Sequence, residues 1–486
     1  MRRRDFLGSA LAAGVILPQG WPRPTRSAAV HYALRYDPAR PGILTVTLTP
    51  PSPAAGGSML VIPRAIPMSY GEAPYDRFVA SVQATSSAGM ALAVTREEGP
   101  RWRLGQPGTA VARVEYTVDL ATMERELLDS SEASKARPAY LGLLGYSVLG
   151  YLDGQETLPC RLEVTAPADW PVFSTLAPSA TPGRGSVTAS VADFYALADS
   201  QVVMGPAIQV RSLSASIPLF VVAYAEGEVD LAIDGGLIED AFRHVAEYFG
   251  TVPFPHYTAY LELVKPLSPR HSYGFSMEHL ESSTYFLDSA RGLTAAATAE
   301  QRERNRFNYA HHIAHAWIPK RGYGTGYHPF RWELAPIIDS IWFAEGFGRY
   351  AAIMALAQDM PAARATAYRA DRLDQLRQFL AAIPPFIRDM DLVELSRIAS
   401  TRYSSDFRTG QTLFSRGALM AAEMDDGIGW DSSGGLTLRD ALRHIMAWCQ
   451  AHPQGFTVAA LPDLITEATG TDVRDIMTRW IKGGAA

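Results

Sequence analysis

Cysteine is scarce in this sequence, with only Cys160 and Cys449 among 486 residues. So few cysteines exclude a disulfide-based scaffold and a metal site made of thiolates. Because the two lie far apart in the chain, we expect them to be unpaired and buried, while a disulfide between them stays an open alternative.

Long basic runs are also missing, and the net charge of −6 is spread along the chain. Without a basic patch or a nucleic-acid-binding motif, we expect no nucleic-acid partner. After the N-terminal stretch, no segment is long and apolar enough for a transmembrane helix, so we expect no membrane span in the mature protein. Hydrophobic residues make up 47% of the sequence and charged residues 19%, which is typical of a globular protein with room for two or three domains.

The N-terminus, MRRRDFLGSALAAGVILP, combines three arginines with a short apolar run. The run is too short to cross a bilayer, and the order Arg-Arg-x-Phe-Leu resembles the twin-arginine export signal. The alternative is a basic start followed by a chance apolar stretch, which the Phe-Leu placement disfavours. We therefore predict a signal peptide at residues 1–29, with cleavage near Ala29, and a periplasmic or secreted protein.

Two domains are predicted after this signal. Residues 30–225 contain short β-branched stretches, such as ILTVTLTP and TAVARVEYTVDL, in which apolar and polar residues alternate between Pro, Gly and Ser turns. Alternation of this kind is typical of half-buried strands, so we predict an all-β sandwich that serves as a scaffold or frames a substrate. Residues 226–486 begin with helix and strand patterns and become mostly helical after residue 298, which predicts an α+β domain.

The stretch HHIAH at residues 311–315 differs by one letter from HExxH, the helical zinc-protease motif. His311 and His315 are four residues apart, so in a helix both imidazoles project from one face and can bind the same metal ion. His312 occupies the position of the motif's glutamate, which is the general base. Packed or surface histidines are the alternative interpretation of this helix.

Glu345 provides a candidate third ligand. It lies in the apolar stretch IDSIWFAEGFGRYAAIMALA, a predicted helix in which a lone carboxylate is costly to bury without a partner. A metal ion would be that partner, and two helices that contribute His, His and Glu leave a fourth position open for water. A salt bridge, or a charge near the start of the helix, stays the alternative role for Glu345.

Two segments, HHIAHAWIPKR and IWFAEGFGRY, resemble the zinc-binding helices of the glycyl aminopeptidase family of gluzincin metallopeptidases. Upstream, YGFSMEHLESSTYF resembles the edge strand of that family, and downstream, LFSRGALMAAEMDDGI resembles its Tyr-x-Lys-Gly helix. The resemblance implies a thermolysin-like gluzincin catalytic domain in residues 226–486, without the PDZ-like domain that many relatives carry. It also implies one zinc ion bound by His311, His315 and Glu345. Glu278 would then lie beside the free α-amino group of the substrate.

Two positions depart from the family pattern, and both bear on catalysis. His312 replaces the glutamate that deprotonates the attacking water, a loss that typically costs about 10²- to 10⁴-fold in rate. Phe414 replaces the tyrosine that stabilises the oxyanion, which typically costs on the order of 10²- to 10³-fold. His312 itself is one candidate base. The candidates for a replacement catalytic group are Tyr403, Glu333 and Glu281.

These residues support three functional hypotheses. The first is an exported zinc metallopeptidase-like protein that acts on the N-termini of peptides or on aminoacyl substrates, with water attacking a carbonyl that zinc polarises. The second is a pseudoenzyme that keeps the metal and binds a peptide or a partner protein. A third hypothesis keeps the metal and assigns it another hydrolytic reaction.

Overall fold

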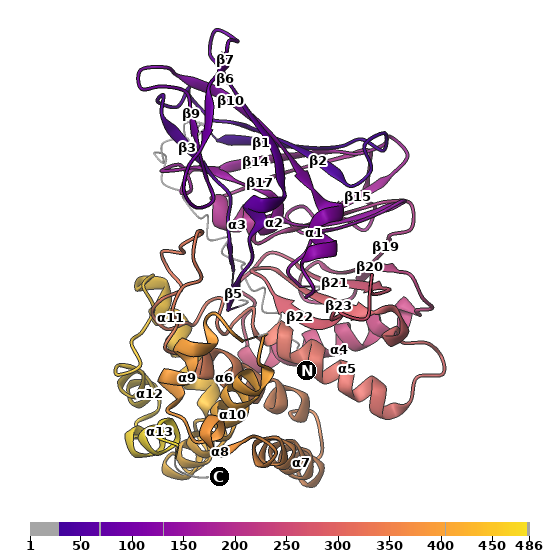
Figure 1. Ribbon diagram of the computed structural model, residues 1–486. Coiled ribbons are helices and arrows are strands. Elements are labelled where there is room, and N and C mark those ends of the chain that lie inside the picture. The colour runs from indigo at the N-terminus through magenta and orange to yellow at the C-terminus, as the bar shows by residue number, and fades with distance from the viewer. Residues whose placement is uncertain (1–28, 68–69, 130, 404, 484–486) are drawn as a thin grey trace, which may run out of the picture.

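The computed structural model describes residues 29–67, 70–129, 131–403 and 405–483, in which a β-rich N-terminal part precedes a mostly helical part (Figure 1). The predicted signal peptide, residues 1–29, therefore lies outside the described residues except for Ala29. No helix of the described ranges is long and apolar enough to cross a membrane. Cys160 and Cys449 are both free and buried, which confirms the expectation of unpaired thiols.

The N-terminal part consists, in its described residues, of three sheets and a two-stranded ribbon. The largest sheet contains, from edge to edge, β17 (Ser186–Val191), β14 (Cys160–Thr165), β1 (Val30–Tyr36), β2 (Ile43–Thr49), β10 (Val111–Asp119), β6 (Val79–Ser86) and β7 (Ala91–Leu92). A second sheet contains β11 (Lys135–Arg137), β12 (Tyr140–Leu144), β18 (Gln201–Met204), β15 (Pro171–Ser174) and β16 (Gly183–Arg184). The third contains β13 (Tyr151–Leu152), β3 (Ser58–Val61), β9 (Arg101–Leu104) and β8 (Val94–Arg96), and the ribbon pairs β4 (Ala65–Ile66) with β5 (Gly71–Glu72). Along β1, buried and less buried side chains alternate as the sequence pattern predicted, because one face of the sheet covers the core.

Short helices connect these strands. They are η1 (Tyr75–Phe78), α1 (Leu120–Glu126), α2 (Gly145–Val148) and α3 (Phe194–Ala198). Two of them start at an aspartate whose side chain accepts a hydrogen bond from a backbone N–H of the first turn: Asp119 for α1 and Asp193 for α3. Such caps satisfy donors that a helix start otherwise leaves unpaired.

A five-stranded sheet lies between the β-rich part and the helices (Figure 1). Its order is β19 (Gln209–Leu213), β20 (Leu219–Ala225), β21 (Tyr257–Val264), β23 (Ser282–Asp288) and β22 (Gly274–Glu278). The three middle strands are parallel, and the helix α4 (Leu231–Phe249) connects β20 to β21. β19 and β20 precede the predicted domain boundary at residue 225, yet they pair into the sheet that continues after it. This sheet therefore begins at Gln209.

The two faces of this sheet pack against different parts of the protein. Leu219, Val221 and Ala223 of β20 belong to the core that the helices share. The core of the β-rich part contains the alternate residues of the same strand, Phe220, Val222 and Tyr224. Successive side chains of a strand point to opposite faces, so a strand buried on both faces joins the two cores.

Helices make up most of the chain after the sheet. They are α5 (Ala299–Ala314), α6 (Ile341–Ala357), α7 (Ala362–Ala381), α8 (Pro385–Arg388), α9 (Leu392–Ala399), α10 (Phe407–Asp431), α11 (Leu438–Ala451), α12 (Leu461–Thr469) and α13 (Arg474–Ile481), with η2 (Ser289–Arg291) before them. The predicted helix over 298–319 ends early, at Ala314, because the chain then turns and His315 donates to the carbonyl of Ile318.

A buried carboxylate, Asp199, joins the β-rich part to the sheet and to the segment after α5. Its oxygens accept hydrogen bonds from Nδ1 of His279 at 2.8 Å and from the backbone N–H of Leu280 at 2.8 Å. Nζ of Lys320 lies 3.1 Å from the same carboxylate. Burial alone would raise the pKa of Asp199, but the charge of Lys320 and the hydrogen bond from His279 hold it below its usual value. The carboxylate is therefore ionised at neutral pH and fully partnered.

We expect Asp199→Asn to lower the free energy of unfolding by about 3–5 kcal/mol, because it leaves the buried ammonium of Lys320 without an opposite charge. Chemical denaturation followed by circular dichroism measures this change. Asp374→Asn is the matched control, since Asp374 forms an exposed pair with Arg377 and its loss should change stability little. Equal stability of the two variants would contradict the role assigned to Asp199.

Candidate metal centre

Helix α5 brings two histidine side chains together. Thr298 and Gln301 form a capping box that fixes the start of the helix. His311 lies in the last turn, and His315 is the capping residue directly after the helix. Their Nε2 atoms are 3.2 Å apart, and both side chains are buried. Spacing by four residues thus places both imidazoles on one face, as the sequence predicted.

Helix α6 adds a buried carboxylate to this pair. Oε2 of Glu345 lies 3.7 Å from Nε2 of His311 and 3.6 Å from Nε2 of His315. The three side chains form a group in which one ligand atom from each lies within 4.8 Å of the others. The structure thus brings together the three residues that the sequence proposed as a metal-binding set.

Two glycines of α6 permit this close approach. A Cβ atom on Gly346 would collide with the backbone of Gly417 in α10, so the two helices touch at this point. A Cβ atom on Gly348 would lie 3.0 Å from Cε1 of His315, which is tighter than ordinary contact. The two glycines that follow Glu345 therefore have separate roles. Gly346 lets α6 lie against α10, and Gly348 leaves space for the ring of His315.

The donor set fits a divalent metal ion. Two ligands at about 2.1 Å from one tetrahedral ion lie about 3.4 Å apart, close to the separations in this group. Nδ1 of His315 donates to the carbonyl oxygen of Ile318 at 2.8 Å, which directs Nε2 toward a metal ion that would displace its proton. Nδ1 of His311 is buried and has no hydrogen-bond partner within the described residues. Two imidazoles and one carboxylate are a typical zinc set.

Electrostatics also favour a cation at this point. Burial opposes charge on every group here, and it lowers the pKa of His311 well below its usual range. Attraction overcomes burial at His315, where the carboxylates of Glu278 and Glu345 raise the pKa to about 9. In turn, the imidazoles hold the pKa of Glu345 well below its usual range. The carboxylates thus create a negative potential where a metal ion would lie.

A cavity of about 510 Å³ opens beside this group. It lies between β22, α5, α6 and α10, and its walls include Glu278, His311, His312, Glu345, Tyr403 and Phe414. Glu278 ends the edge strand β22, is buried, and its Oε1 has no hydrogen-bond partner in the described chain. Burial raises the pKa of Glu278, while attraction to His315 opposes that rise. The metal-binding group and Glu278 therefore face one cavity.

His312 faces the same cavity from α5. Its Nδ1 donates to the carbonyl oxygen of Asn308 at 2.9 Å, and its ring packs edge-on against Tyr285 at 5.7 Å between centroids. Burial, together with the neighbouring His315, lowers the pKa of His312 to about 4. The imidazole is therefore neutral at neutral pH and keeps one ring nitrogen free of a backbone bond.

The structure distinguishes among the proposed replacement groups. Glu333 pairs with Arg101 of the β-rich part, and Glu281 lies 3.3 Å from His256. Neither lines the cavity, whereas Tyr403 does. The hydroxyl of Tyr403 lies beside the Glu345 carboxylate, and burial followed by this negative charge raises the pKa of Tyr403 well above its usual value. Among these candidates, Tyr403 places a hydroxyl next to the metal-binding group, whereas Phe414 has no hydroxyl to donate a hydrogen bond.

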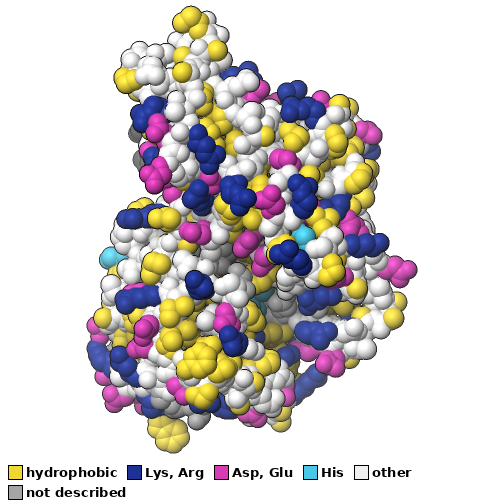
Figure 2. Space-filling view, in the orientation of Figure 1, with side chains coloured by type: hydrophobic (Ala, Val, Ile, Leu, Met, Phe, Trp, Pro, Cys, Tyr) yellow, Lys and Arg dark blue, Asp and Glu magenta, His cyan; other side chains and the backbone are white. Residues whose placement is uncertain are grey.

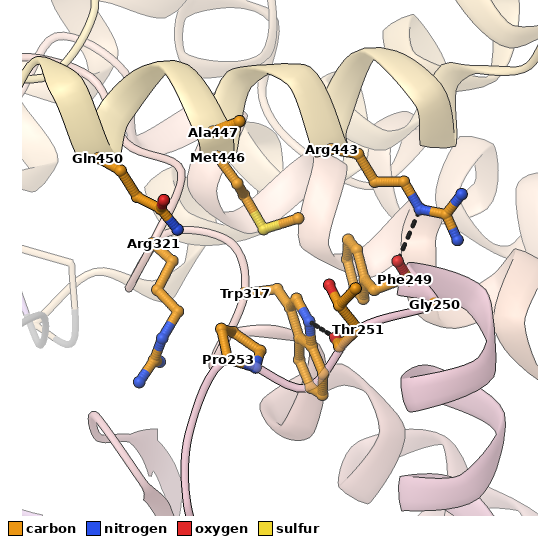
Figure 3. A pocket seen from close by; sticks show the side chains of 10 residues that line it. All are labelled: Phe249, Gly250, Thr251, Pro253, Trp317, Arg321, Arg443, Met446, Ala447 and Gln450. Atoms are coloured by element: carbon orange, nitrogen blue, oxygen red, sulfur yellow. Dashed lines mark hydrogen bonds between the residues drawn. The ribbon is translucent and has the colours of Figure 1, made fainter. Parts of the chain in front are cut away.

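A second pocket of about 340 Å³ lies between the end of α4, the segment after α5, and α11 (Figure 3). Trp317 forms its floor, and the indole N–H donates to the carbonyl oxygen of Thr251 at 2.8 Å. Arg443 also donates to the backbone there, at Phe249. None of the candidate metal ligands lines this pocket. Its described contacts anchor the turn after His315 to the end of α4, which is a structural role.

Comparisons with known proteins agree with this architecture. Residues 31–206 match the family model of the Peptidase M61 N-terminal domain. An aminopeptidase N family protein from Idiomarina loihiensis superposes with a TM-score of 0.80 at 18% identity, over 94% of this chain and 76% of that chain. A mutant M1 zinc metallopeptidase from Deinococcus radiodurans, bound to the substrate Tyr-Ser-Ala, superposes with a TM-score of 0.56 at 16% identity, over 95% of each chain. No curated protein sequence matches the chain.

At such identities, the likeness to solved structures shows a common fold. The predicted order of a β-rich domain and a mostly helical part is confirmed as the order found in M1 aminopeptidase folds. The family match covers residues 31–206, and the solved structures add a common fold over most of the chain.

We expect the purified protein to bind about one divalent metal ion per chain, because two imidazoles and a carboxylate converge at bonding separations. His315→Ala and Glu345→Gln should each abolish stoichiometric zinc, measured by elemental analysis after loading and desalting. His452→Ala, at an exposed histidine, is the control and should retain it. A chelator should also lower the unfolding temperature of the wild type but not of Glu345→Gln. Full zinc content in both ligand variants would contradict the assignment.

Proposed function

We propose that this protein is an exported, zinc-binding metallopeptidase-like protein of the glycyl aminopeptidase family that binds peptides by their N-termini. The observation that carries the proposal is the convergence of His311, His315 and Glu345 beside a cavity that also contains Glu278. The cavity keeps the groups that bind a substrate, while positions 312 and 414 lack the expected proton-transfer and oxyanion groups. Hydrolysis is therefore the weakened step, and binding is the retained one.

His311, His315 and Glu345 would hold zinc, which supplies a Lewis acid that polarises a carbonyl group. Glu278 provides the site for the α-amino group. Its buried carboxylate has an oxygen without a partner in the described residues, and an ammonium group supplies the charge and the donors that it lacks. Because Glu278 ends an edge strand, a peptide can also lie along β22.

His312 and Phe414 limit the chemistry of this cavity. An imidazole whose pKa is lowered to about 4 is a weaker proton acceptor at neutral pH than a base tuned near 7. The ring of Phe414 cannot donate a hydrogen bond to an oxyanion. If the two effects are independent, the typical losses multiply to about 10⁴- to 10⁷-fold in rate.

An active peptidase is the second candidate function, and one arrangement favours it. His312 and Tyr403 line the same cavity as the metal-binding group, and both are neutral at neutral pH. A neutral imidazole can accept a proton from the attacking water, and a phenol can donate a hydrogen bond to an oxyanion. In that case His312 would take the role of the family's glutamate at the same position. Tyr403 would take the role of the family's tyrosine from another position.

The signal predicted at residues 1–29 supports the exported location. Twin-arginine export moves a folded protein, so the metal site would be assembled before export. A periplasmic or secreted protein with this cavity would meet peptides outside the inner membrane.

We expect His312→Glu to raise kcat/KM for short peptides and aminoacyl amides by about 10²-fold or more, because it restores a carboxylate base. Adding Phe414→Tyr should raise it further, by on the order of 10²-fold, through the restored hydroxyl. Phe407→Tyr is the matched control, since Phe407 lines the same cavity, and its new hydroxyl should have little effect. Zinc content is measured for every variant.

Two results would separate the candidate functions. Turnover that is low in the wild type and rises in the two variants supports a protein whose hydrolysis has been weakened. Robust wild-type turnover that is lost in Tyr403→Phe and in His311→Ala would instead establish the second candidate.

A further inference from the structure

An arginine that the sequence motifs did not single out lines the cavity of the metal-binding group. Arg349 lies four residues after Glu345 in α6, so the two side chains project from the same face one turn apart. It contributes to the wall of the same cavity of about 510 Å³. Any group bound in the cavity beyond the metal-binding group therefore lies near this guanidinium.

Aromatic rings are the protein groups that contact the Arg349 guanidinium. Its central carbon lies 4.1 Å from the ring centroid of Phe414 and 5.4 Å from that of Phe307. The Nε atom is buried and makes no hydrogen bond, and within the described residues no carboxylate forms an ion pair with this side chain. Desolvation lowers its pKa to about 10, against the attraction of Tyr403 and Glu345, so Arg349 still carries its charge at neutral pH.

Two other arginines in protected positions, Arg416 and Arg137, have protein partners. The guanidinium of Arg416 donates to the backbone carbonyls of Met390 at 2.5 Å and Arg388 at 3.0 Å. Arg137 pairs with Glu124 and Glu226. A desolvated guanidinium is costly unless its donors and its charge are met. Arg349 has no such hydrogen-bond acceptor or ion-pair partner among the described residues. Because it lines the cavity, a bound ligand can supply both.

The other charges of the cavity leave an excess of positive charge at this end. Arg291 and Arg304 are exposed at its wall, and neither forms an ion pair with a described residue. Asp129 lines the cavity as well, but its Oδ1 accepts two hydrogen bonds from Ser131. Figure 2 shows Lys and Arg side chains, together with some Asp and Glu side chains, around the hollow on this face of the molecule.

We propose that Arg349 binds a carboxylate of the peptide, so that the cavity prefers peptides with an acidic side chain or a nearby C-terminus. This proposal rests on the proposed function, because it adds a second anchor for the same ligand. A guanidinium offers parallel donors that match the two oxygens of a carboxylate. One helical turn rises about 5.4 Å, and an extended peptide advances about 3.3 Å per residue. The carboxylate therefore belongs to a residue within one or two positions of the bond held at the metal-binding group.

Binding of three tripeptides to the zinc-loaded protein, measured by titration calorimetry, tests the proposal. The probes are Ala-Glu-Ala-amide, Ala-Gln-Ala with a free C-terminus, and Ala-Gln-Ala-amide, which carries no carboxylate. We expect at least one carboxylate-bearing probe to bind about 10- to 100-fold more tightly than the neutral amide. The probe that gains affinity identifies the source of the carboxylate. Mass spectrometry after each titration checks that the peptides are intact.

Variants assign the preference to one side chain. Arg349→Met keeps an apolar chain against Phe414 and should remove the preference, while Arg349→Lys should retain part of it because the charge remains without the fork. Arg211→Met is the matched control, since Arg211 is exposed on β19, at the opposite edge of the sheet from β22. It should bind all probes as the wild type does. Thermal unfolding of each variant verifies that it is folded.

The two negative outcomes of the binding experiment lead to different conclusions. Equal affinity of the wild type for all three probes, or a preference that persists in Arg349→Met, overturns the role of Arg349 and leaves peptide binding intact. No binding of any probe, the neutral amide included, overturns the proposed peptide-binding function and this inference with it.

Discussion

The carboxylate of Asp199 is the contact on which the geometry of the cavity depends. It accepts from His279, which follows Glu278 directly, and it pairs with Lys320, five residues after His315. One buried group of the β-rich part thus fixes the end of the edge strand and the turn that follows the metal-binding helix. Because the carboxylate is buried and ionised, displacing either segment would leave a charge unpaired at high cost. The N-terminal part is in this sense a component of the site.

Glycine packing fixes the position of Glu345, the third candidate ligand. The backbones of α6 and α10 touch at Gly346 and Gly417, and Gly348 leaves room for the ring of His315. These contacts involve backbone and the metal-binding residues, and they do not involve the side chains of His312 or Phe414. The chemistry at those two positions can therefore change while the metal-binding group keeps its shape. This separation explains how one fold can support either a hydrolytic enzyme or a binding protein.

Local rules account for what could be predicted from the sequence. Residues four apart share a helix face, so the proximity of His311 and His315 followed from spacing alone. Contacts between distant segments could not be predicted in this way. The strand β20 is a continuous apolar run and β19 is a short polar-rich strand, and only pairing with β21 and with each other assigns them to the central sheet. Likewise, the choice of Tyr403 among the replacement candidates depends on a loop that lies against Glu345, which no local pattern encodes.

The cavity retains several charges that are expensive to keep. The carboxylates of Glu278 and Glu345 are buried, the guanidinium of Arg349 is partly buried, and each lowers stability unless a partner of opposite charge is present. Their natural partners are an ammonium group, a metal cation and a carboxylate, and a peptide held at a metal ion supplies the first and the last. A protein that had lost its ligand as well as its catalysis would be more stable with apolar residues at these positions. The pairing of these charges with His312 and Phe414 is therefore what the proposed function requires, namely a site that would bind a peptide and differ from the family pattern in the chemical step.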